Sequence, residues 1–111
     1  MPTYEDFEKL GILAGKVVKV EDFPEAKKPA YKLWIDFGKS GTKKSSAQLT
    51  KLYKKEELLN RMIIAVTGFP AKQIANFVSE VLVLGVIDKD NNVVLLKLDK
   101  EDGIELGSKI C

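Results

Sequence analysis

Residues 31–37 alternate strictly between two kinds of side chain, and this pattern constrains the fold more than any other in the chain. One set is apolar and consists of Tyr31, Leu33, Ile35 and Phe37, and the other consists of Lys32, Trp34 and Asp36. Because successive side chains of a strand point to opposite faces, we predict a β-strand with one fully apolar face. The other face carries the only tryptophan of the chain between two charges.

The rest of the chain divides into short elements separated by turn signals. Residues 3–11 fit a short helix, with Thr3 as its cap and Gly11 at its end. Further strands are predicted at residues 12–23, 42–49, 61–69, 79–88 and 93–98, and a second short helix at residues 51–60. Loops are predicted at residues 24–29, 70–78 and 102–110, the last with a short extended segment. Gly15 is expected to mark a bulge or bend inside its strand.

This order of elements predicts the architecture. A helix, three strands, a second helix and then two or three strands follow the order of an OB-fold, a five-stranded Greek-key barrel. We therefore expect an all-β fold with short helices, in which residues 1–111 form one domain with an N-terminal helix and a C-terminal extension. The second and third strands of that fold form a binding face for oligonucleotides, and Trp34 falls on the second strand.

Positive charge is concentrated in one quarter of the chain. Residues 27–55 contain nine lysines and one acid, Asp36, so their net charge is +8, whereas the whole chain carries +2. A block of one sign attracts a partner of the opposite sign, which favours an anionic ligand. The alternative is a lysine-rich surface that is merely solvated.

The composition disfavours catalysis. The chain has no histidine and a single cysteine, Cys111, so the commonest general base and the commonest transition-metal ligand are missing. The glycine spacing does not fit a phosphate-binding loop. We therefore expect that the protein is not an enzyme and that it has no metal site and no cofactor. The apolar runs are too short to cross a bilayer, and one thiol suits a reducing compartment, so we expect a cytoplasmic protein without membrane insertion.

Five residues on the second and third predicted strands are candidates for binding a nucleic acid or a peptide. They are Lys32, Trp34, Lys43, Lys44 and Gln48. Unpaired nucleic acid is bound by stacking bases on aromatic side chains beside a basic track, so Trp34 is expected to stack and the lysines to meet phosphates or acidic groups. Lys44 and Gln48 are expected on one face, and Lys43 on the other. Alternatively, Trp34 is buried under a helix or a second subunit, and Gln48 bonds to a neighbouring loop.

Residues 81–86, "VLVLGV", are apolar on both faces of their predicted strand. One face of a small barrel strand fills the interior, so the outer face requires cover. A two-fold homodimer is the commonest solution, with the stripe Tyr4, Phe7 and Leu10 and residues 93–96 as further parts of the contact. Cover by the chain's own N-terminal helix is the alternative.

Three stretches resemble the CsaA family. They are "YEDFEKLGILAGKVVKVEDFPEAKKPAYKLWIDFG" (4–38), "KKSSAQLT" (43–50) and "FPAKQIANFVSEVLVLGV" (69–86). The resemblance implies a small dimeric OB-fold protein related to the tRNA-binding domain of some methionyl-tRNA synthetases. It also implies an export-related chaperone that binds unfolded or precursor polypeptides.

The resemblance adds one new candidate site residue, Ser79, and the loop before it supplies another. The wider domain often carries "SEGM", where this chain has "SEVL", so Ser79 and Glu80 match while Val81 and Leu82 depart. Ser79 is carried over as a hydrogen-bonding residue, and the same resemblance supports Lys32. Lys72 joins them because it lies in the loop that leads to Ser79, although a solvated loop lysine is the alternative.

Two functional hypotheses follow. The first is a CsaA-like chaperone with a tRNA-binding OB-fold, which binds unfolded polypeptides, tRNA or both in a groove on each subunit of a dimer. The second is a stand-alone tRNA-binding module that acts in trans with an aminoacyl-tRNA synthetase. The two differ in whether unfolded polypeptides bind.

Overall fold

The alternating segment is strand β2 (Tyr31–Asp36), and its apolar set lies at the centre of the core. In the computed structural model, which describes residues 1–111, Leu33 and Ile35 are fully buried, as is Phe37 just after the strand. Leu58, Ile63 and Val17 pack in the same cluster. The pattern read from the sequence therefore gives the correct inward face of β2.

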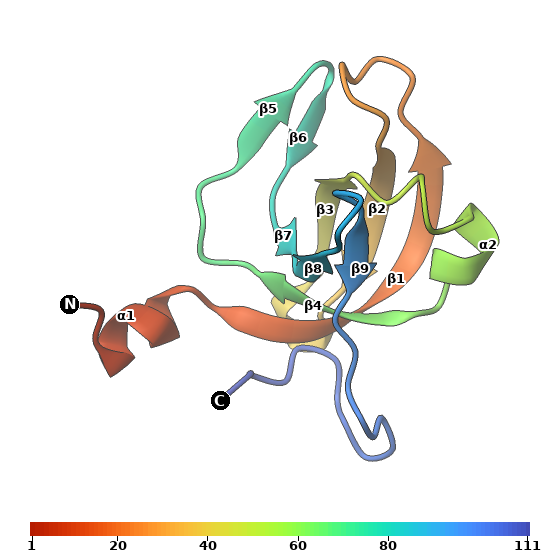
Figure 1. Cartoon of the computed structure of the whole chain (residues 1–111). Helices are drawn as coiled ribbons and strands as arrows, with labels where there is room; N and C mark the ends of the chain where they lie inside the picture. The colour runs from red at the N-terminus through yellow and green to blue at the C-terminus, as the bar shows by residue number, and fades with distance from the viewer.

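Five antiparallel strands form one sheet in the order β3-β2-β1-β4-β7, and this sheet curls into a nearly closed barrel (Figure 1). The strands are β1 (Ile12–Asp22), β2, β3 (Thr42–Ala47), β4 (Met62–Val66) and β7 (Leu82–Val83). The helices are α1 (Tyr4–Lys9), the 3-10 turn η1 (Gly38–Ser40) and α2 (Lys55–Leu58). The predicted all-β, OB-like fold is confirmed, and α2 is shorter than the helix predicted at residues 51–60.

Strand β1 is the central strand of the five-stranded sheet and pairs along both of its edges. Residues 16–22 pair with β2, and residues 12–16 pair with β4. The bulge lies between Val17 and Lys19, not at Gly15, so the predicted position was wrong. Gly15 instead makes room for the core, since a Cβ there would lie 2.6 Å from the Phe37 ring and 2.7 Å from Ile35. The bend and the close packing are thus separate features of this strand.

Two hairpins stand outside the five-stranded sheet. One pairs β5 (Lys72–Ile74) with β6 (Phe77–Ser79), and the other pairs β8 (Gly85–Ile87) with β9 (Val93–Leu95). The loop predicted at residues 70–78 is therefore wrong, because it contains the β5–β6 hairpin, which turns through Ala75 at a φ of +49°. The strand predicted at residues 79–88 is also divided, between the end of β6, β7 and β8.

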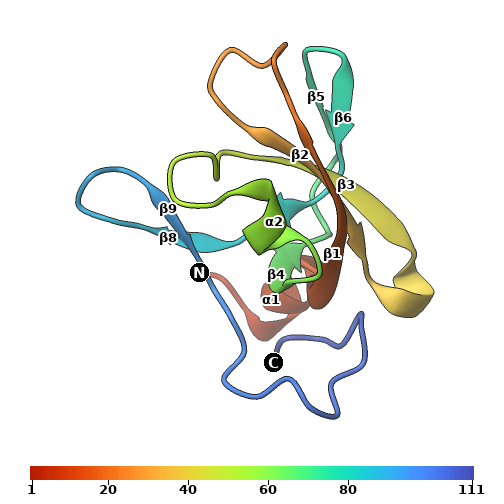
Figure 2. The ribbon, with the colours of Figure 1, turned by 90° about the vertical axis from the view of Figure 1, so that its right-hand side faces the viewer.

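The two ends of the molecule are made of different segments. The β1–β2 loop and the β5–β6 hairpin lie side by side at one end (Figures 1 and 2). Helix α1 and the C-terminal segment lie at the other end, where Lys109 forms an isolated antiparallel β-bridge with Leu13 of β1. Helix α1 buries none of its residues, and all of β8 is exposed, so the N-terminal helix does not cover that strand. No helix combines the length and apolar character needed to span a membrane.

Candidate nucleic-acid interface

The outer face of β1, β2 and β3 carries a continuous set of polar and aromatic side chains. The strand register places Trp34 between Lys19 on β1 and Lys44 on β3. It likewise places Lys32 between Glu21 and Ser46. Since paired residues of neighbouring strands share a face, Lys32, Trp34 and Lys44 lie together.

Trp34 belongs to a small aromatic cluster on this outer face, together with Phe23 and Phe77. Phe77 of β6 packs edge-on against both of its partners, with ring centroids 5.7 Å from Trp34 and 5.5 Å from Phe23. The tryptophan is therefore partly covered by the β5–β6 hairpin, and neither a helix nor a second subunit is needed to shield it. This cluster fixes the hairpin to the barrel, because its edge-to-face ring pairs are favourable beyond their buried area.

Three lysines lie against the rings of the aromatic cluster. The Lys19 Nζ lies 4.5 Å from the Trp34 ring centroid, and Lys44 and Lys32 lie 5.2 Å and 5.8 Å from that of Phe77. Cation–π attraction at these distances holds the ammonium groups near the rings. Glu21 bridges to both Lys19 (3.3 Å) and Lys32 (3.6 Å) and neutralises part of the charge.

A groove adjoins this face where the β1–β2 loop, the end of β3 and the β5–β6 hairpin meet. It consists of three cavities of about 620, 310 and 290 Å³ that share Ser46 and Gln48 in their walls. Its cationic lining residues are Lys27, Lys28 and Lys72. Three predicted site residues, Gln48, Lys72 and Ser79, line this groove, which we call the seam groove.

Lys43 is the one predicted site residue on the opposite face. It pairs with Ile35, whose side chain is fully buried, so Lys43 belongs to the inward face of the sheet near its end. Its face also carries Ser45, which is 1 % exposed and whose Oγ has no hydrogen-bond partner. Lys43 therefore does not join the basic face made by Lys32 and Lys44.

Ser79 and Glu80 have a structural contact that sequence reasoning did not anticipate. The Ser46 N–H donates to Ser79 Oγ (3.0 Å), and the Lys44 N–H donates to Glu80 Oε1 (3.0 Å). These side chains satisfy edge groups of β3 that no neighbouring strand reaches. The Ser-Glu pair thus closes part of the gap between β3 and β7.

Several site residues escaped the sequence reasoning. Lys27 and Lys28 lie inside the +8 block, and the β1–β2 loop brings them to the seam groove. Phe77 lay in a predicted loop, so its role in covering Trp34 had no visible signal. Lys19 is also a ring partner, and only the register across the β1 bulge reveals it.

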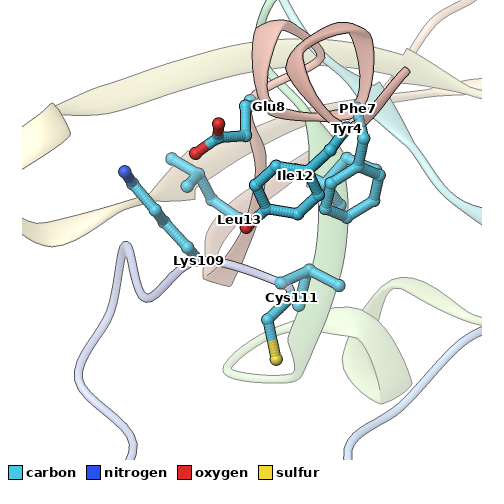
Figure 3. Close-up of a pocket in the computed structure, with 9 residues that line it drawn as sticks. Tyr4, Phe7, Glu8, Ile12, Leu13, Lys109 and Cys111 are labelled. Carbon is cyan, nitrogen blue, oxygen red and sulfur yellow. The ribbon is translucent and has the colours of Figure 1, made fainter. Parts of the chain in front are cut away.

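Two further features lie outside the groove. Lys55 of α2 donates to Asp22 Oδ2 (2.9 Å), which raises the pKa of the lysine and ties α2 to the end of β1. At the other end of the molecule, Figure 3 shows Tyr4 and Phe7 of α1 beside Leu13 of β1, with Cys111 below them and its sulfur pointing away. These side chains line a pocket of about 110 Å³ that is mostly hydrophobic.

Known proteins resemble this chain over nearly its whole length. Residues 12–109 match the family model described as "Putative tRNA binding domain". The methionine–tRNA ligases of Pyrococcus horikoshii and Thermococcus onnurineus are 39 % and 36 % identical to it over 107 residues, 96 % of this chain. The chain spans only 14 % of the length of these relatives.

Solved structures extend the comparison. The CsaA chaperone protein of Picrophilus torridus is 58 % identical, with a TM-score of 0.89 and both chains fully covered. The chaperone CsaA of Bacillus anthracis is 47 % identical, with a TM-score of 0.91, and the match covers 100 % of this chain and 99 % of that one. These matches confirm the resemblance seen in the sequence. The chain therefore belongs to the tRNA-binding domain family and, within it, groups with the CsaA proteins.

Proposed function

We propose that the chain binds tRNA, or structured RNA with an unpaired loop, in the seam groove and on the adjoining face of β2 and β3. The observation that carries this proposal is the arrangement of cations. Lys27, Lys28 and Lys72 line the groove, while Lys32 and Lys44 stand beside the aromatic cluster. Phosphates neutralised by lysines supply most of the affinity of non-specific nucleic-acid binding.

The shape of the site favours an unpaired segment over a duplex. The grooves of double-stranded RNA are read mostly by shape, whereas splayed bases enter pockets and stack on aromatic rings. The seam groove offers cavities between loops, and Trp34 is partly exposed beside it. The match to methionine–tRNA ligases and to the tRNA-binding family makes tRNA the first RNA to test.

A charge-reversal experiment tests this proposal. We expect Lys27→Glu, Lys28→Glu and Lys72→Glu together to weaken tRNA binding by at least about tenfold at low salt. The control reverses three lysines outside the groove, Lys89, Lys97 and Lys100, and therefore changes the net charge equally. If the two triple variants bind equally well, the RNA does not occupy the seam groove.

We also propose polypeptide binding as a second function, because the structures at 58 % and 47 % identity are both described as chaperones. One cavity of the seam groove is mostly apolar, with Leu49, Leu82, Val83 and Val93 in its walls. Such a cavity suits the side chains of an unfolded segment. The chain is expected to slow the aggregation of a denatured protein at stoichiometric amounts, with weak salt dependence. An unchanged aggregation rate would refute this second function.

We further propose that the chain forms a homodimer. Val86 and Ile87 of β8 are 58 % and 66 % exposed, and Val94 of β9 is 40 % exposed. An isolated two-stranded hairpin is only marginally stable, so a second copy related by a two-fold axis would stabilise it. Val86→Asp with Ile87→Asp is expected to give a monomer by sedimentation equilibrium, whereas Leu59→Asp, just after α2, leaves the dimer intact. A dimer that survives the double change would place the contact elsewhere.

The chain is proposed to act by binding alone, without catalysis or a cofactor. Location in the cytoplasm, a role in protein export and action in trans with an aminoacyl-tRNA synthetase are also proposals from the sequence. Co-purification with a methionyl-tRNA synthetase would support the last of these.

A further inference from the structure

The barrel does not close between its two edge strands. Strands β3 and β7 are the ends of the five-stranded sheet, and they do not pair with each other. Residues 79–81, just before β7, form hydrogen bonds across the gap to Lys44 and Ser46 of β3. The Lys44 carbonyl accepts from the N–H groups of Glu80 (2.7 Å) and Val81 (3.2 Å), and Ser79 Oγ accepts from the Ser46 N–H.

Two backbone groups remain free just beyond that point. Alternate residues of a strand direct their N–H and C=O groups to the same edge, so the Ser46 carbonyl and the Gln48 N–H follow Lys44 along this gap. Neither group has a hydrogen-bond partner within the chain. Ser46 is half-buried and Gln48 is exposed, so these two groups are accessible to water or to a ligand.

The free pair opens into the seam groove, not onto a flat surface. Ser46 and Gln48 are the residues common to all three cavities of the groove. On one side stands the mostly apolar cavity of about 290 Å³, with Leu82 and Val83 of β7 in its wall. The largest of the three cavities has Lys27, Lys28 and Lys72 in its wall. A planar apolar group with polar atoms on its edge and a phosphate attached matches this arrangement.

We propose that this gap binds one unpaired RNA base, with the Ser46 carbonyl accepting from its Watson–Crick edge and the Gln48 N–H donating to it. The proposal rests on the RNA binding proposed above and names how a base is held there. All four bases carry a donor beside an acceptor on that edge. Recognition by the backbone therefore tolerates any base, while the lysines hold the flanking phosphates.

A base fits the free groups better than an added peptide strand does. Strand addition relies on a series of main-chain hydrogen bonds along an open edge. Here the groups before Ser46 C=O are already occupied, and the chain turns after Gln48, where the Leu49 N–H donates to the Ala47 carbonyl (2.9 Å). Two adjacent hydrogen bonds suit the edge of a single base.

The test compares two RNA hairpins that differ only in the loop, one of uridines and one of N3-methyluridines. Methylation removes the N3–H donor without disturbing the stem. When the uridine hairpin binds, we expect the backbone amide signal of Gln48 to shift in NMR spectra. We also expect the hydrogen of this amide to exchange more slowly with water. The methylated loop is expected to bind about fivefold more weakly, since roughly one hydrogen bond is lost.

Gln48→Ala is the matched control, because it removes the side-chain amide and keeps the backbone N–H. This variant is expected to retain the sensitivity to methylation. If the uridine hairpin binds but neither the Gln48 amide nor the affinity responds as stated, the base site is wrong and the proposed RNA binding stands. If neither hairpin nor tRNA binds, the proposed function fails as well. A Gln48 amide shift produced by an unfolded polypeptide and not by RNA would assign the gap to peptide binding and overturn the inference.

Discussion

Replacing Phe77 by alanine tests the role of the aromatic cluster in holding the binding surface. Phe77 is 7 % exposed and packs against Trp34 and Phe23 on the outer face of the barrel. Phe→Ala changes in cores cost about 3–5 kcal/mol. Phe77 and Phe23 are buried together with only one other residue, Ala30, apart from the main core, so we expect the lower end, about 3 kcal/mol. That is a large share of the roughly 5–15 kcal/mol that stabilises a typical domain.

Two measurements follow this change. Urea unfolding monitored by circular dichroism gives the loss of stability, and the emission of Trp34, the only tryptophan, reports whether its cover has gone. We expect a red shift and weaker tRNA binding, since Lys72 sits on the same hairpin. Phe69→Ala is the control, because Phe69 is 48 % exposed, and its effect is expected to stay within about 0.5 kcal/mol. Unchanged stability and emission in Phe77→Ala would show that the cluster does not fix the hairpin.

Three further changes test the barrel and its edge, each by urea unfolding. Gly15→Ala is expected to destabilise the fold by about 1–3 kcal/mol, because its Cβ would overlap the Phe37 ring, and an unchanged midpoint would refute that packing. Ser45→Ala is expected to stabilise it by about 1 kcal/mol, because the buried hydroxyl has no partner; a loss of stability would reveal a hidden hydrogen bond. Ser79→Ala is expected to cost about 1 kcal/mol by leaving the Ser46 N–H unpaired, and a neutral result would reassign Ser79 to ligand contact alone.

The sequence predicted those parts of the fold that depend on contacts between residues close together in the chain. The alternation in β2 gave its buried face, and the turn before Val93 gave the β8–β9 hairpin. In that turn Asp88 Oδ1 accepts from the N–H groups of Asp90 and Asn92, a local contact that sequence signals capture well. The helix cap at Thr3 is local in the same way.

The missed features depend on contacts between distant segments. Strands β5 and β6 have three residues each, too few for alternation to be visible, so Phe77 was placed in a loop. The hydrogen bond between Ser46 and Ser79 joins residues 33 positions apart. The free Gln48 N–H follows from the failure of two strands to pair, and no residue pattern encodes that absence.

The salt dependence of tRNA binding tests the central claim most directly. The claim is that the lysines of the seam groove neutralise phosphates, and each such contact contributes about 0.7 to the slope of log affinity against log salt for single strands. Replacing Lys27, Lys28 and Lys72 by methionine should therefore reduce the magnitude of this slope by about 2. The same change at Lys89, Lys97 and Lys100 should leave the slope unaltered. An equal slope for both variants would contradict the account.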